Sequence, residues 1–251
     1  LRLAALSSFR DGPDAQPTAL AGSDRLVTDY VRAELLSGLS SEQASFMLQA
    51  SVLHRMSPAL CDFVLRRSRS GAMLRDLERS NAFVAAIDRD ERWYRFHDLV
   101  RESLKAELER QDPTLPRLLQ ERAAEWHAAN QMPLEAVHYR QDSGDDAATV
   151  RMMATCTQEQ FGRGRTATIL GWLRWAEERD LLGVDPALAM SGALVFALHG
   201  DPERAMRFAN VLYAMKGGSQ SGVDEVALRS WQAVIRAYFC ERGVSEAISD
   251  G

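Results

Sequence analysis

The chain has 251 residues, of which 46% are hydrophobic and 26% are charged, and its formal net charge is -5. A chain of this length can bury a substantial core, while its negative charge argues against non-specific attraction of the whole chain to nucleic acid. Three distant cysteines indicate no disulfide framework or zinc knuckle, and the lack of a long apolar run or a signal peptide predicts a cytoplasmic protein with no membrane partner.

The first predicted elements are a short apolar helical end, residues 1–9, and a linker. The linker contains Asp11-Gly12-Pro13, a sequence that cannot continue a helix. Residues 1–21 are therefore assigned to the end of a preceding helical region and its linker. Because the first residue is Leu1 rather than methionine, we expect the chain to be a piece of a longer protein.

A helical domain is predicted over residues 22–112. Ser40 and Gln43 have the spacing of a capping box and predict a helix start. Ser57-Pro58 predicts another, because proline at the first helical position loses only an amide that has no intrahelical partner. Ser23 is a candidate N-cap for an earlier helix, and apolar residues recur at helical spacing after each start. The four predicted helices therefore start near residues 23, 41, 58 and 70.

Two short β runs follow these helices, at residues 82–87 and 92–96, on either side of the charged turn 88–91. A helix that begins at His97-Asp98 and continues to Gln111 comes next. Helices followed by a hairpin and a closing helix are typical of a winged helix.

The segment Trp93-Tyr94-Arg95-Phe96-His97, with Leu99 two residues later, resembles the winged-helix domain of MalT-type, LuxR-class transcriptional activators of the signal-transduction ATPase group. The resemblance implies that His97 contacts the β-phosphate of ADP held by an upstream ATPase domain of the same chain. It also implies that Asp98 caps the helix carrying His97. Arg95 and Arg101 are candidates for a phosphate or interdomain contact. The spacing alone leaves open that His97 is only a helix cap or an interdomain polar contact.

Residues 113–251 read as paired amphipathic helices without a β run. Asp185-Pro186 and Asp201-Pro202 each combine an N-cap with proline at the first helical position. Helix starts recur at close to the ~34-residue tetratricopeptide spacing, so the expected fold is mainly α, with a winged helix followed by a tetratricopeptide-like solenoid. The expected helices cover seven segments: residues 118–130, 134–142, 147–156, 166–182, 187–199, 203–215 and 226–242.

Four tryptophans of the solenoid are candidates for an inducer-binding face: Trp126, Trp172, Trp175 and Trp231. Repeat core is the commoner role of such residues. Gly162-Arg163-Gly164-Arg165 lacks the P-loop pattern and is better explained as a helix linker. No catalytic signature appears, and His127 and His138 lack a metal-ligand pattern, so neither an enzyme nor a metal site is expected.

These observations favour a non-catalytic sensor segment of an ATP-dependent, LuxR-class regulator. The resemblance implies ATP or ADP in the full-length protein and none on this segment alone, a small-molecule or protein inducer on the solenoid, and DNA contact through a C-terminal domain outside this chain. A free-standing helical-repeat adaptor that binds another protein is the alternative. Direct DNA contact by the winged helix is a third possibility, which the acidic residues of the turn 88–91 disfavour.

Overall fold

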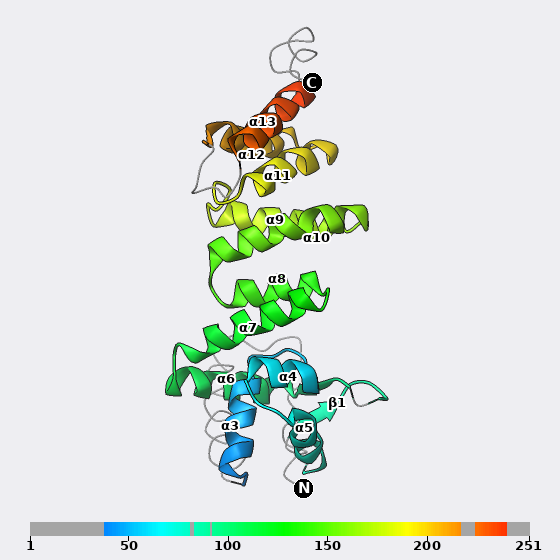
Figure 1. Cartoon of the computed structure of the whole chain (residues 1–251), viewed down its shortest axis with the longest axis vertical. Coiled ribbons are helices and arrows are strands. Elements are labelled where there is room, and N and C mark those ends of the chain that lie inside the picture. Colours follow the sequence, from blue (N-terminus) through cyan, green and yellow to red (C-terminus); the bar gives the residue numbers. More distant parts are fainter. Residues whose placement is uncertain (1–37, 81–82, 91, 217–223, 240–251) are drawn as a thin grey trace, which may run out of the picture. The chain divides into compact units, whose positions relative to one another are not determined.

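The computed structural model describes residues 38–80, 83–90, 92–216 and 224–239. The fold is mainly α-helical, with one two-stranded antiparallel sheet in the described residues, as predicted. It divides into two compact units, Leu1–Asn130 and Gln131–Gly251. Figure 1 shows the elements in chain order. The helical end and linker predicted over residues 1–21, the helix expected after Ser23 and the last three residues of the helix expected over 226–242 lie outside the described residues.

Two capped helices open the described part of the first unit. α3 (Ser41–Ala50) has the predicted capping box: Ser40 Oγ accepts a bond from Gln43 N at 3.2 Å, and Gln43 Oε1 accepts one from Ser40 N at 3.0 Å. α4 (Pro58–Val64) starts with proline, and Ser57 Oγ accepts a bond from Leu60 N at 3.2 Å. Both predicted starts are therefore confirmed.

α5 (Ser70–Arg79) follows α4 after a five-residue connection. Arg66 and Arg69 in this connection have positive φ angles of 53° and 66°. α4 and α5 pack against each other, and a Cβ at Gly71 would lie only 3.3 Å from the Pro58 ring. Two helices that pack together across a short connection form a helix-turn-helix pair.

The hairpin pairs β1 (Val84–Ala86) with β2 (Tyr94–Phe96), and Ala85 faces Arg95 across the ladder. Backbone bonds of 2.8 Å in both directions join Tyr94 to Met56, in the loop between α3 and α4. β2 thus pairs with β1 on one side and with this loop on the other. The hairpin, which is the wing of the predicted winged helix, is therefore fixed to the helices of the first unit.

α6 (Asp98–Gln111) packs against α3, and α7 (Leu115–Ala129) packs against α4 and α6. Arg122 Nη1 also donates a bond of 3.1 Å to the carbonyl oxygen of Val64. α7 begins three residues before the predicted start at residue 118, because Pro116 lies in its first turn. The predicted domain boundary falls between residues 112 and 113, whereas these contacts group α7 with the first unit.

The second unit contains only helices in its described part. The order is α8 (Pro133–Asp142), α9 (Asp146–Gly162), α10 (Thr166–Glu178), α11 (Pro186–Leu198), α12 (Pro202–Ala214) and α13 (Glu225–Phe239). Each helix packs against the next, and α11 also packs against α9 and α13 (Figure 1). Contacts with both the next helix and the next but one are typical of helical repeats.

Two helix ends in this unit differ from the prediction. α9 continues to Gly162 instead of residue 156, and its polar Thr157 is accommodated by a bond from its Oγ1 to the carbonyl of Met153. α10 ends at Glu178 instead of residue 182, because Asp180 has a positive φ of 57° that turns the chain. No helix in the described residues is long and apolar enough to cross a membrane.

Candidate functional site

His97 lies at the junction between the hairpin and α6. Its φ and ψ of -63° and 136° are those of an N-cap residue. Its amide donates a bond of 3.0 Å to the carbonyl of Phe83, and its carbonyl accepts a bond of 2.9 Å from Arg101 N. Its side chain is exposed and makes no capping bond. The backbone is thus held from both sides while the imidazole faces outward.

Asp98 is exposed and occupies the first position of α6. We expected Asp98 to cap this helix, and this expectation is wrong because His97 occupies the N-cap position and no side chain caps α6. A carboxylate in the first turn still interacts favourably with the positive end of the helix dipole. Asp98 therefore contributes through charge rather than through a capping bond.

Arg95 shares the outward face of β2 with His97. Tyr94 and Phe96 are buried and Arg95 is exposed, and residues two apart in an extended strand point to the same side. Arg101 follows His97 by one helical turn, is only partly exposed and forms an ion pair with Glu102. A histidine ring nitrogen and two guanidinium groups are the donors that bind phosphate oxygens in proteins.

Apolar contacts hold this junction against the first unit. Val100 and Leu104 on α6 are buried, and so is Phe96 at the end of β2. Trp93 at the start of β2 meets Trp126 of α7 edge to face, with ring centroids 6.5 Å apart. The position of His97 is therefore determined by the packed core beneath it.

The four tryptophan candidates are divided between the units. Trp126 is half-buried in the first unit. In the second unit Trp172 is a buried member of the hydrophobic core, and Trp175 and Trp231 are half-buried against that core. The Arg179 guanidinium lies 4.5 Å from the Trp175 ring centroid. Trp172 thus has little ring surface for a ligand, and an inducer role for the others stays a prediction.

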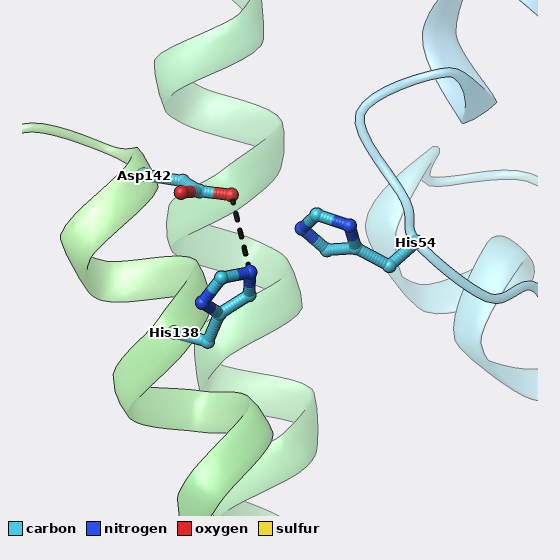
Figure 2. A group of neighbouring side chains, drawn as sticks. All are labelled: His54, His138 and Asp142. Atoms are coloured by element: carbon cyan, nitrogen blue, oxygen red, sulfur yellow. Dashed lines mark ion pairs between the residues drawn. The ribbon is translucent and has the colours of Figure 1, made fainter. Parts of the chain in front are cut away.

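The two other histidines considered in the sequence, His127 and His138, have partners on their own helices. His127 is buried, and its Nδ1 lies 2.7 Å from the carbonyl oxygen of Ala123. His138 Nε2 lies 4.0 Å from Asp142 Oδ2, one turn further along α8 (Figure 2). His54, also drawn there, belongs to the first unit. Residues 163–165 form a short connection between α9 and α10, as expected of a helix linker.

Comparison with known proteins gives matches over the winged helix and beyond it. Residues 32–116 match the family model described as MalT winged helix domain. Serine/threonine-protein kinase PknK of Mycobacterium tuberculosis (strain CDC 1551 / Oshkosh) is 32% identical over 155 residues, which cover 61% of this chain and 14% of that protein.

Two transcriptional regulators give similar matches. HTH-type transcriptional regulator MalT of Vibrio campbellii is 27% identical over 162 residues, which are 64% of this chain and 18% of that protein. HTH-type transcriptional regulator MalT of Klebsiella pneumoniae is 31% identical over 152 residues, which are 58% and 16% of the two chains. The chain spans less than a fifth of the length of these curated relatives.

Proposed function

We propose, from the match of residues 32–116 to the MalT winged helix domain, that the chain is the regulatory segment of an ATP-dependent transcriptional regulator. In this proposal an ATPase domain of the same polypeptide holds ATP or ADP, and a separate domain binds DNA. The chain itself performs no catalysis. Its role is to couple the nucleotide state of the ATPase domain to activation.

The exposed imidazole of His97 is the observation that carries this proposal. The ring stands at the start of α6, where unpaired amides and the helix dipole favour an anion, and its backbone is held by Phe83 and Arg101. A phosphate held by a docked ATPase domain accepts a bond from this ring in the ADP state. Arg95, on the same outward face, adds positive charge to that contact.

This contact works as a switch only if the winged helix binds one nucleotide state more tightly than the other. A near-complete change of state requires about 5.5 kcal/mol of differential binding. One charge-assisted hydrogen bond contributes about 1.5–3 kcal/mol, so His97 supplies a part of the difference. The remainder comes from the inducer, which in this proposal binds the second unit and favours the ATP state.

The test is His97→Ala in the full-length protein, read out as transcription of a target promoter without inducer. Loss of the phosphate contact releases the closed state, so basal transcription rises by about tenfold or more, the factor that corresponds to about 1.5 kcal/mol. The matched control is His199→Ala, which removes an exposed histidine from the C-terminal end of α11. Unchanged basal transcription with normal protein levels contradicts the sensor role and favours the adaptor alternative.

A further inference from the structure

Four exposed arginines lie along α5 and the connection that precedes it. Arg66 and Arg69 lie in the connection between the two helices, and Arg75 and Arg79 lie on α5, and all four are exposed. We call this group the arginine face. It is a local concentration of positive charge in a chain whose formal net charge is -5, so the average composition gives no indication of it.

The pattern of burial along α5 places Arg75 and Arg79 on one stripe. Ser70, Leu74 and Leu77 are buried against the unit, whereas Arg75 and Arg79, one turn apart, are exposed on the opposite side. Arg66 and Arg69 precede the helix and are exposed in the connection. Arg79 Nη1 lies 4.0 Å from Asp76 Oδ1, a distant and highly exposed pair. Among the described residues, no carboxylate pairs with Arg69 or Arg75.

The acidic side chains of the hairpin turn are already engaged. Asp88 Oδ1 accepts bonds from the amides of Arg92 and Trp93 at 3.0 and 2.8 Å. Asp90 Oδ2 lies 2.6 Å from Arg92 Nη2, an exposed ion pair that offsets its charge. Asp88 keeps its negative charge, so the turn is less acidic than its sequence but is not neutral.

The dimensions of α5 also suit a duplex. An α-helix with its side chains is about 10–12 Å in diameter, which fits the ~12 Å width of the major groove. α5 is the second helix of the α4–α5 pair, the position of the groove-binding helix in helix-turn-helix proteins. An acidic protein segment would satisfy the charges but would not require this arrangement.

We propose that the arginine face binds the phosphate backbone of double-stranded DNA through Arg66, Arg69, Arg75 and Arg79. This contact is independent of the nucleotide sensor and is weak and largely sequence-independent, because phosphate contacts carry affinity without base recognition. Together with the proposed function, it gives the regulator a second DNA contact besides that of its separate DNA-binding domain.

The experiment is a fluorescence anisotropy titration of the 251-residue chain with a labelled mixed-sequence duplex of about 20 base pairs over a series of salt concentrations. If four arginines each neutralise one phosphate, the plot of log K against log salt has a slope of about -3.6. The triple variant Arg69→Gln/Arg75→Gln/Arg79→Gln lowers the slope to about -0.9 and reduces affinity roughly 100-fold at about 0.1 M salt.

The control is Arg151→Gln/Arg174→Gln/Arg229→Gln, which changes the net charge equally at three exposed arginines of the second unit. This control retains the wild-type slope. Circular dichroism checks that both variants fold, and the three single variants, each lowering the slope by about 0.9, replace the triple variant if it does not. His97→Ala leaves DNA affinity unchanged, so the result is distinguishable from a failure of the sensor proposal.

Three outcomes overturn the inference. The first is absence of binding in low salt, and the second is an equal loss of affinity in the control variant, which indicates only net charge. The third is tighter binding of a labelled polyglutamate peptide than of the duplex. That result assigns the arginine face to an acidic protein segment instead of DNA.

Discussion

The two units begin their helices in different ways. In the first unit, Ser40 and Ser57 cap α3 and α4, and α6 starts at His97 without a side-chain cap. In the second unit, every helix with a side-chain cap among those described begins with an aspartate, which is Asp145, Asp185 or Asp201. The capped helices of the second unit thus use aspartate where those of the first use serine, and each unit also has described helices that start without a side-chain cap, which are α5, α6 and α7 in the first and α8 and α10 in the second.

The two units also pack differently. A repeat unit buries a continuous core by stacking similar helices. The first unit instead combines helices with a hairpin, and α6 starts beside that hairpin at the exposed His97 without a side-chain cap. Each unit therefore has its own core, and the two can be tested separately.

The largest effect that tests whether the two units unfold separately is expected for Phe96→Ala. Phe96 is 1% exposed and anchors β2 beside His97, and truncation of a buried phenylalanine costs about 3–5 kcal/mol. Urea denaturation should show this loss in the first unit, while the transition of the second unit stays in place. Arg95→Ala, at the exposed neighbouring position, should change stability by less than about 0.5 kcal/mol. A shift of both transitions by Phe96→Ala contradicts independent units.

A smaller effect, confined to the second unit, is expected for Gly192→Ala. A Cβ at Gly192 in α11 would lie 2.1 Å from Phe208 Cδ1 in α12, so the helices must separate or the ring must move. Overpacking of this kind costs about 1–3 kcal/mol. The matched control is Gly171→Ala in α10, where a Cβ meets nothing within 4 Å.

In a helix, alanine is about 1 kcal/mol more favourable than glycine. Gly171→Ala should therefore stabilise the second unit, and Gly192→Ala should destabilise it, in urea denaturation followed by tryptophan fluorescence. The same sign for both variants contradicts the close α11–α12 packing.

The sequence predicts local structure in this molecule better than it predicts surfaces. Capping residues act within one helical turn, so Ser40, Ser57 and Asp201 predicted helix starts directly, and the hairpin followed from two β runs around a charged turn. The end of α10 was missed because the left-handed turn at Asp180 carries no glycine. The site residue His97 came from a family resemblance, and its exposure required the structure.

The arginine face was not predicted, because its charges become one surface only after folding. Arg66 and Arg79 lie 13 positions apart in the sequence (79 minus 66). The dense arginines of residues 66–79 are an available signal in the sequence, whereas the acidic turn 88–91 alone decided the prediction against DNA contact. Only hydrogen bonding in the hairpin shows that Asp88 and Asp90 are engaged.

The smallest effect, and the most specific to the aspartate caps, is expected for Asp201→Asn. Hydrogen bonds from the backbone amide and then from the side chain of Arg204 lower the pKa of Asp201 below its ordinary value. A carboxylate whose pKa is lower in the folded state stabilises the fold above its ordinary pKa. That stabilisation is lost as the pH falls from the ordinary value, about 4, through the lower folded value.

The asparagine side chain of this variant keeps an oxygen that can accept the Arg204 amide bond but carries no charge, so the variant should be less stable than wild type at neutral pH and equal to it at strongly acidic pH. Asp201→Ser, which also keeps an acceptor, should behave in the same way, whereas Asp201→Ala should be less stable at every pH because it removes the cap itself. Thermal unfolding followed from strongly acidic to neutral pH separates these effects. If Asp201→Asn retains the full wild-type pH dependence across the acidic range, the charge of Asp201 does not stabilise α12, and the aspartate caps of the second unit act only as hydrogen-bond acceptors, like the serines of the first.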